Sequence, residues 1–279
     1  MSQTITFGPS AENFNVSRTL TSQYSRIRFN GLVSEPSMQM VADTMDEAFS
    51  YYHYDSIEIE INSPGGDARA LDYLLEHCEN WRVAGRKIAT RGGLTCGSAG
   101  ALMLSFGDIG TRQVSKSTEL LFHHSRAMME KAFVTAHVAE QMAIQLNALD
   151  RKMVDTLVNH ILPHGDDAAF DGLALMQNRY HWLNVNFQES GESTISEHIS
   201  RKEMLLLRHI FGGPEVKKRE RVIEYIRSRF QADKRMALLE AYVLNLIDEV
   251  RGVTPSNEPG ACFNRTFRGY KDKDRSRWL

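Results

Sequence analysis

The fold is decided by the stretch Ile57-Glu58-Ile59-Glu60-Ile61-Asn62-Ser63-Pro64-Gly65-Gly66. Strict alternation of isoleucine with glutamate predicts a β-strand over 57–61 with one buried face. The residues from Asn62 to Gly66 have the composition of a turn. Asp67 is suited to cap a helix that buries one side, formed by Ala68, Leu71, Leu75 and Cys78. The stretch is therefore expected to fold as strand, turn and helix.

Similar units stand on both sides of this stretch. Before it, Arg26-Ile27-Arg28-Phe29 predicts a short strand, and an amphipathic helix is predicted by the apolar stripe Met38, Val41, Met45, Phe49 and Tyr52. After it, residues 87–90 and 120–122 are candidate strands. Alternation of strands and helices implies right-handed crossovers and a largely parallel sheet. The predicted fold class is therefore α/β.

The second half of the chain is more helical and less regular. A long helix, packed on the core or on a neighbouring subunit, is predicted by the stripe Val134, Val138, Met142, Leu146, Leu149, Met153 and Leu157. Prolines and glycines punctuate residues 163–214, which we interpret as an insertion, and a helical pattern returns at 215–230.

We therefore divide the chain into three parts. Residues 1–24 are polar and aperiodic and are expected to form an arm or loop. Residues 25–251 form the main domain, with the insertion at about 163–214. Residues 252–279 are rich in Gly, Pro, Arg and Lys; they could touch acidic partners, but a solvated tail is the better interpretation.

Composition excludes several classes of protein. With 279 residues, 42% of them hydrophobic, the chain can bury a full core, and a net charge of −2 gives no general electrostatic basis for binding nucleic acid. Cys78, Cys96 and Cys262 fit no zinc spacing and no disulfide framework. We expect no metal, no cofactor, no signal peptide and no membrane span, and hence a cytoplasmic protein.

Ser98 is the strongest candidate nucleophile. It stands among small residues in Gly92-Gly93-Leu94-Thr95-Cys96-Gly97-Ser98-Ala99-Gly100-Ala101, directly before an apolar run that predicts a buried helix. Small neighbours allow substrate and backbone to approach closely. The start of a helix offers unpaired N–H groups to a developing negative charge.

His123 is the candidate base. It follows the apolar Leu120-Leu121-Phe122, so it is expected at the exit of a buried strand. A histidine there can take a proton from a serine near neutral pH, although in isolation a half-buried histidine bonded to a carbonyl is the commoner case. The turn 62–66 could cradle a phosphate or a carbonyl oxygen, but it lacks the glycine patterns of nucleotide-binding loops.

Three segments together resemble the signature segments of the Clp protease proteolytic subunit. They are Ile61-Asn62-Ser63-Pro64-Gly65-Gly66, Gly97-Ser98-Ala99-Gly100-Ala101 and Leu121-Phe122-His123, in family order and with family-like spacing. The resemblance covers roughly residues 25–160 and resumes at about 220–250. It implies a crotonase-like fold of spiral ββα repeats, with a helical insertion between the catalytic histidine and aspartate.

The resemblance also implies a set of site residues. Glu240 to Asp248 is similar to the family's segment downstream of the catalytic aspartate, with Asn245 in place of the usual glycine. The family's offset leads back to Asp233, which completes a Ser98-His123-Asp233 triad, while Asp248 is expected to be structural. Asp150 and Asp155 are rivals for the acid, both expected on the exposed side of the long helix. The backbone N–H groups of Gly66 and Ala99 are the implied oxyanion donors.

The implied function is a serine endopeptidase that cleaves peptides or unfolded proteins inside a homo-oligomeric ring, which an ATP-dependent AAA+ unfoldase could feed. The long insertion and Asn245 leave open a non-catalytic scaffold or a partner of an active paralogue. A phage-type head-maturation protease is a further alternative. Acyl-CoA chemistry is disfavoured, because related enzymes use carboxylates there rather than a Ser/His pair.

Overall fold

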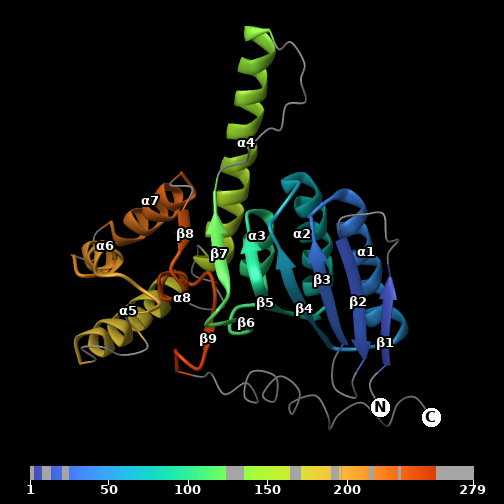
Figure 1. Cartoon of the computed structure of the whole chain (residues 1–279), viewed down its shortest axis with the longest axis horizontal. Helices are drawn as coiled ribbons and strands as arrows, with labels where there is room; N and C mark the ends of the chain where they lie inside the picture. Colours follow the sequence, from blue (N-terminus) through green and yellow to red (C-terminus); the bar gives the residue numbers. More distant parts are fainter. Residues whose placement is uncertain are drawn as a thin grey trace.

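A single large β-sheet organises the computed structural model (Figure 1). The structure describes residues 3–7, 14–20, 25–123, 135–163, 171–189, 195, 197–213, 217–231 and 234–255. Within these ranges the sheet has nine strands in the order β1-β2-β3-β4-β5-β6-β9, with β7 paired to β5 and β8 paired to β7. This mixed α/β architecture confirms the predicted fold class.

The middle of the sheet is parallel, as the alternation of strands and helices predicted. Parallel pairs join β3 to β4, β4 to β5, β5 to both β6 and β7, and β6 to β9. The strands concerned are β3 (Ser25–Gly31), β4 (Ser56–Ser63), β5 (Lys87–Gly97), β6 (Arg112–Ser115), β7 (Glu119–Phe122) and β9 (Glu249–Arg251).

The expectation of an irregular arm over residues 1–24 is wrong. Gln3–Phe7 (β1) pairs with Phe14–Leu20 (β2), and β2 pairs with β3, both antiparallel. Arg18 of β2 is fully buried and donates to Glu47 at 3.0 Å. The polar composition concealed these strands, because one of their buried side chains is a paired arginine.

The two faces of the sheet differ in chemistry, as the alternation in 57–61 predicted. The isoleucines of β4 are buried beneath α1 (Glu35–Asp46), α2 (Ala68–Val83) and α3 (Ala99–Ser105), with the π-helical turn η1 (Glu47–Tyr51) extending α1. Glu58 and Glu60 point to the other face, where Glu58 pairs with Arg26 and Arg91 and Glu60 with Arg28. Asp67 caps α2 as expected, accepting from the Arg69 N–H at 2.8 Å.

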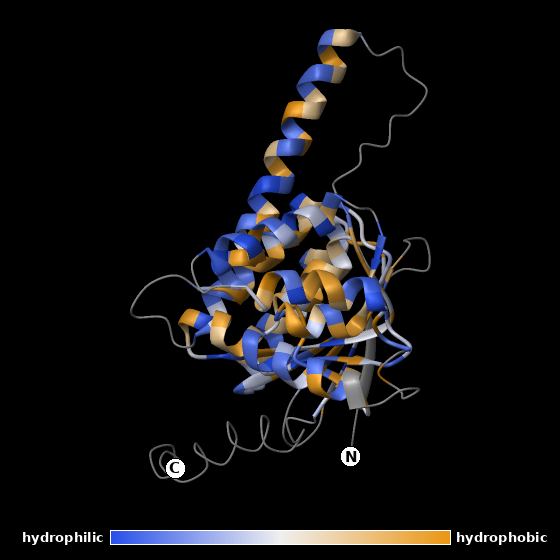
Figure 2. Ribbon diagram, turned by 90° about the vertical axis from the view of Figure 1, so that its left-hand side faces the viewer, coloured by the Kyte–Doolittle hydropathy of each residue, from blue (hydrophilic) through white to orange (hydrophobic). Residues whose placement is uncertain are grey.

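The long helix α4 (Ala136–Ile161) is confirmed, but only its second half packs on the core. Its buried residues are Met153, Val154, Leu157, Val158 and Ile161. The first half projects from the body of the molecule (Figures 1 and 2), and along it hydrophobic and hydrophilic residues alternate.

The stretch that the sequence analysis interprets as an insertion, about 163–214, is largely helical where the structure describes it. It contains α5 (Gly172–Glu189) and α6 (Arg201–Phe211), and α7 (Lys218–Gln231), β8 (Lys234–Met236) and α8 (Leu238–Val243) follow. Arg179 of α5 enters the core beside Arg112, and both guanidinium groups bind the fully buried Asp248. Burial alone would raise the pKa of this carboxyl, but the two arginines hold it well below its usual range.

Asn245, which stands where the resemblance leads us to expect glycine, has a defined structural role. Its φ of 57° lies in the left-handed region that glycine adopts freely and that asparagine tolerates better than most residues. Its side chain accepts from Arg112 at 2.7 Å and from Arg179 at 3.1 Å, and donates to the Ile161 carbonyl at 2.9 Å. The substitution therefore ties α4 and α5 to the core.

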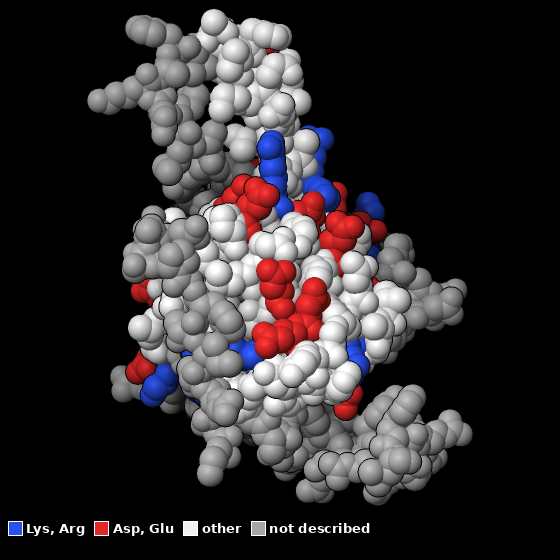
Figure 3. Space-filling model, turned by 90° about the vertical axis from the view of Figure 1, so that its right-hand side faces the viewer, with Lys and Arg blue, Asp and Glu red and all other residues white. Residues whose placement is uncertain are grey.

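Acidic side chains gather over the middle of the face shown in Figure 3. Among the described residues, no helix is long and apolar enough to cross a membrane.

Candidate active site

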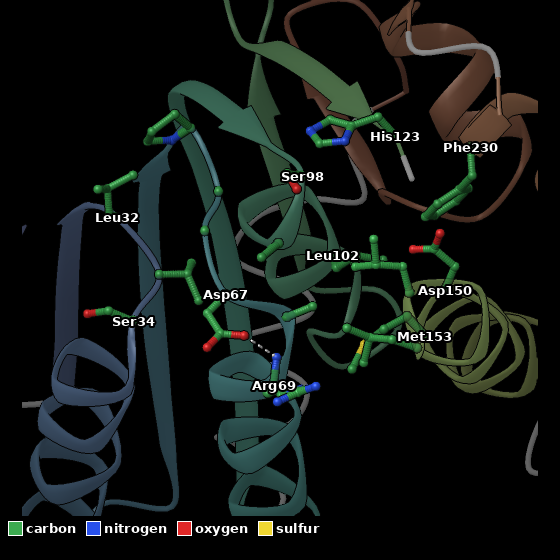
Figure 4. A pocket seen from close by; sticks show the side chains of 18 of the residues that line it. Leu32, Ser34, Asp67, Arg69, Ser98, Leu102, His123, Asp150, Met153 and Phe230 are labelled. Carbon is green, nitrogen blue, oxygen red and sulfur yellow. Dashed lines mark hydrogen bonds between the residues drawn. The ribbon is translucent and has the colours of Figure 1, made fainter. Parts of the chain in front are cut away.

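Ser98 stands at a sharp turn between β5 and α3. Its φ of 50° and ψ of −123° are unusual for a residue other than glycine. Its N–H donates to the Leu121 carbonyl at 2.7 Å, which fixes the turn to strand β7. Figure 4 shows the hydroxyl facing a pocket. A strained backbone held by its surroundings is common at functional positions.

The glycines of the 62–66 turn lie against this serine and against Val33, which follows β3. A side-chain carbon added at Gly65 would lie 2.4 Å from Ser98 Cβ and 3.2 Å from the Ala99 nitrogen. One added at Gly66 would lie 2.0 Å from the Val33 carbonyl oxygen. Both glycines also have positive φ, so the turn requires glycine at these positions for its conformation and for its close contacts.

Gly66 and Ala99, whose backbone N–H groups are the candidate oxyanion donors, line the same pocket as Ser98. Val33 donates to the Gly65 carbonyl and accepts from the Asp67 N–H, both at 2.8 Å. Since successive N–H groups of an extended chain point in opposite directions, the Gly66 N–H points away from Val33, toward the side of β5. Ala99 is the first residue of α3, and such a residue has no acceptor within its own helix.

His123 follows β7 directly, as predicted. β7 is parallel to β5, with Leu121 opposite Gly97, so the ends of the two strands bring His123 and Ser98 to the same edge of the sheet. Both residues line one pocket, and Figure 4 shows both side chains facing it.

The pocket has a volume of about 650 Å³ and runs from the start of α1 to α4 and α7. An apolar wall is formed by Leu102, Met142, Leu146, Leu149, Met153 and Phe230. Its ionisable lining residues, apart from His123, are Asp67, Arg69 and Asp150. The sequence did not reveal that α4 and Phe230 line this pocket, because the stripe on α4 is equally typical of ordinary core packing.

The candidate acids lie in different surroundings. Asp233 lies outside the described residues. Asp155 is exposed and pairs with Arg227 at 2.8 Å, away from the pocket. Asp248 belongs to the buried arginine pair, as its expected structural role required. Asp150 was expected to be exposed, which is wrong: it is half-buried and lines the pocket, because α4 crosses the site at this point.

The two cysteines in the described residues are poorly suited to nucleophilic catalysis. Cys78 and Cys96 are buried, and burial raises the pKa of each thiol to about 12, so neither is a thiolate near neutral pH. Within the described ranges, no group of three or more His, Cys, Asp or Glu side chains could hold a metal ion.

Comparison with known proteins agrees with this geometry. A sequence model of the Clp protease family matches residues 15–186, which include β2 to α4 and most of α5. The chain belongs to the Clp protease family, and its class is that of a ClpP-like peptidase with a crotonase-like fold. No curated protein matches the chain.

Proposed function

We propose that this protein is a serine endopeptidase that uses Ser98 as nucleophile and His123 as base. The observation that carries the proposal is their common pocket, which Ser98 lines from a strained strand-to-helix turn and whose lining also includes Gly66 and Ala99. Family membership supports peptide-bond hydrolysis as the reaction.

The reaction follows from these positions. The Ser98 oxygen attacks the peptide carbonyl while His123 accepts its proton, and the carbonyl oxygen becomes an anion. The Gly66 and Ala99 N–H groups donate to this anion, a type of contact whose loss typically costs about a hundredfold or more in rate. His123 then protonates the leaving amine, and water, deprotonated by His123, releases the acyl group from Ser98.

Asp233 is the acid that we propose to orient His123. β7 and β8 are antiparallel, with Phe122 opposite Lys234 and Leu121 opposite Arg235. His123 follows Phe122 in the sequence and Asp233 precedes Lys234, so one more pair in this register would join His123 to Asp233. The register of β7 and β8 thus supports Asp233, the residue to which the family's sequence spacing leads.

Assembly into a homo-oligomeric ring is part of the same proposal. The projecting half of α4 carries Val138 and Ile144, which are 45% and 55% exposed. Apolar side chains on an extended helix favour contact with another subunit. We propose peptides or unfolded proteins as substrates; an AAA+ unfoldase would be needed only for folded ones.

A fluorophosphonate probe tests the proposal, because it forms a covalent bond with an activated serine. We expect mass spectrometry to find the probe on Ser98, no labelling of Ser98→Ala, and labelling at least about a hundredfold slower in His123→Ala and Asp233→Asn. Ser117→Ala, between β6 and β7, should label normally. A folded protein that stays unlabelled would favour the non-catalytic scaffold.

A further inference from the structure

A cluster of charged and polar side chains, centred on Glu240, joins α7 to α8. Glu240 of α8 is fully buried. Its carboxylate accepts from the Tyr225 hydroxyl at 2.7 Å and from Arg229 Nη2 at 3.0 Å, and Arg229 Nε lies 2.6 Å from its Oε1. Tyr225 and Arg229 both belong to α7. Because a buried carboxylate needs such partners, the cluster fixes the last turns of α7 against α8.

The same cluster reaches strand β8. Arg229 Nη2 also donates to the Arg235 carbonyl at 3.2 Å, and β8 is paired with β7. Strand β7 ends at Phe122, directly before His123. Glu240 therefore acts, through Arg229, on the strand that lies next to the one leading to His123.

An aromatic contact joins the end of α7 to the pocket. Phe230 follows Arg229 and lines the candidate active site (Figure 4). Its ring packs against Phe122, with 5.2 Å between the ring centroids. Phe122 directly precedes His123, so the position of α7 bears on the candidate base from a second side.

We propose that Glu240 is a positioning residue for His123. This inference rests on the proposed function. Glu240 and Arg229 hold the end of α7 and β8 together, and Asp233 stands between these two elements in the sequence. An acid that orients an imidazole must be held within hydrogen-bond distance of it, so the elements on both sides of that acid must be fixed. Loss of the cluster should therefore weaken the contact of Asp233 with His123.

The pH dependence of Ser98 labelling by a fluorophosphonate tests this role, because labelling requires His123 in its unprotonated form. A carboxylate beside the imidazole raises its pKa, so a displaced Asp233 lowers that pKa. The acid limb of the labelling rate then moves to lower pH while the maximal rate falls. A loss of folded protein alone would lower the rate at every pH and leave the limb in place. The other charged residues that line the pocket are the same in all the proteins compared: Asp67, Arg69 and Asp150.

Arg229→Gln breaks the pair with Glu240. In the full chain we expect a maximal labelling rate about tenfold lower and an acid limb about one pH unit lower. Arg229→Lys keeps a positive charge near Glu240 and should stay within about threefold of the unchanged protein. In the background of Asp233→Asn, Arg229→Gln should change the rate less than about twofold, because the contact that it positions is already lost.

Arg227→Gln is the matched control. Arg227 lies on the same helix, is exposed and pairs with Asp155 at 2.8 Å, so its loss should change neither the rate nor the limb. Tyr225→Phe is a milder variant, which removes one hydrogen bond to Glu240 and no charge. It should fold even if Arg229→Gln does not, with labelling about threefold slower and the limb moved in the same direction.

The outcomes separate this inference from the proposed function. If Asp233→Asn moves the acid limb but the folded Arg229 and Tyr225 variants do not, the inference is wrong and the peptidase stands. Equal losses of rate from Arg229→Gln with and without Asp233 would give the cluster a role in folding alone and would also overturn the inference. An acid limb that Asp233→Asn leaves in place would remove both Asp233 and this inference while Ser98 and His123 stand. If Ser98 of the folded, unchanged protein is unlabelled, both proposals are overturned.

Discussion

Arg179 of α5 donates to the carboxylate of Asp248 at 2.7 Å, although 69 positions separate them in the sequence. The same guanidinium donates to the carbonyls of Tyr242 and Ile247 at 2.9 and 3.0 Å, and it stacks 4.6 Å from the Tyr242 ring. One buried side chain thus holds α5 against the segment that leads into β9.

Replacing Arg179 with alanine is expected to lower the free energy of unfolding by about 3 kcal/mol. The carbonyls and Asp248 would each lose the Arg179 donor, although Arg112 would still pair with the carboxylate. Urea denaturation measures the loss. Arg208→Ala, at an exposed position on α6, should change stability by less than about 0.5 kcal/mol. Equal stability of the two variants would contradict the anchoring role of Arg179.

Asn245 supports a second prediction, in which two substitutions are ranked. Asn245→Gly removes the side-chain hydrogen bonds but suits the positive φ, and about 2 kcal/mol of stability should be lost. Asn245→Ala removes the same bonds but, unlike glycine, keeps a Cβ at a position with left-handed φ. This variant should therefore be about 1 kcal/mol less stable than Asn245→Gly. Thermal or urea unfolding would reveal the order, and an alanine variant more stable than the glycine variant would refute it.

Gly65→Ala is expected to abolish labelling of Ser98 while the protein remains folded. The added carbon would lie 2.4 Å from Ser98 Cβ and 2.8 Å from the Gly97 carbonyl oxygen, so Ser98 must move. We expect the labelling rate to fall by about a hundredfold or more. Circular dichroism and the urea midpoint would show whether the variant folds.

Gly85→Ala is the control for this substitution. Gly85 also has positive φ, 80°, but a carbon added there meets no atom within 4 Å. Gly85→Ala therefore imposes backbone strain of about 1 kcal/mol without steric contact, and the probe should still label Ser98 in this variant. Loss of labelling in both variants would show that general destabilisation, and not the contact with Ser98, is responsible.

Local patterns predicted the elements that carry the candidate catalytic groups. The alternation in 57–61, the turn and the Asp67 cap depend on neighbouring residues, so the sequence was sufficient for them. Ser98 and His123 could be found because each follows a strand, and parallel strands end at the same edge of a sheet.

Tertiary contacts decided the features that the sequence did not reveal. β2 was missed because its buried Arg18 depends on Glu47, which is 29 positions away. Asp150 was predicted to be exposed because hydrophobic periodicity shows which residues share a face of a helix. It does not show which other elements the helix packs against. The roles of Arg179 and Asn245 likewise depend on packing between distant segments.

His160 makes stability depend on pH. Its ring lies 5.4 Å from Phe106, and its Nε2 is 3.0 Å from the Gly107 carbonyl oxygen. Burial, followed by the charges of Arg112 and Arg82, lowers the pKa of His160 to about 4. Its ordinary pKa is about 6.5, so between pH 6.5 and pH 4 the unfolded chain binds the proton and the folded chain does not. The stabilisation is therefore complete above pH 6.5 and is lost progressively as pH falls toward 4.

We expect the free energy of unfolding to be about 1–2 kcal/mol lower at pH 5 than at pH 7 on account of this group. His160→Gln cannot titrate, so it should remove that part of the difference even if it lowers stability at both pH values. His209→Gln, at an exposed position on α6, should keep the full difference. Urea denaturation of the three proteins at both pH values provides the comparison. A His160→Gln variant with an unchanged pH dependence would show that His160 is protonated as readily in the folded chain as in the unfolded one.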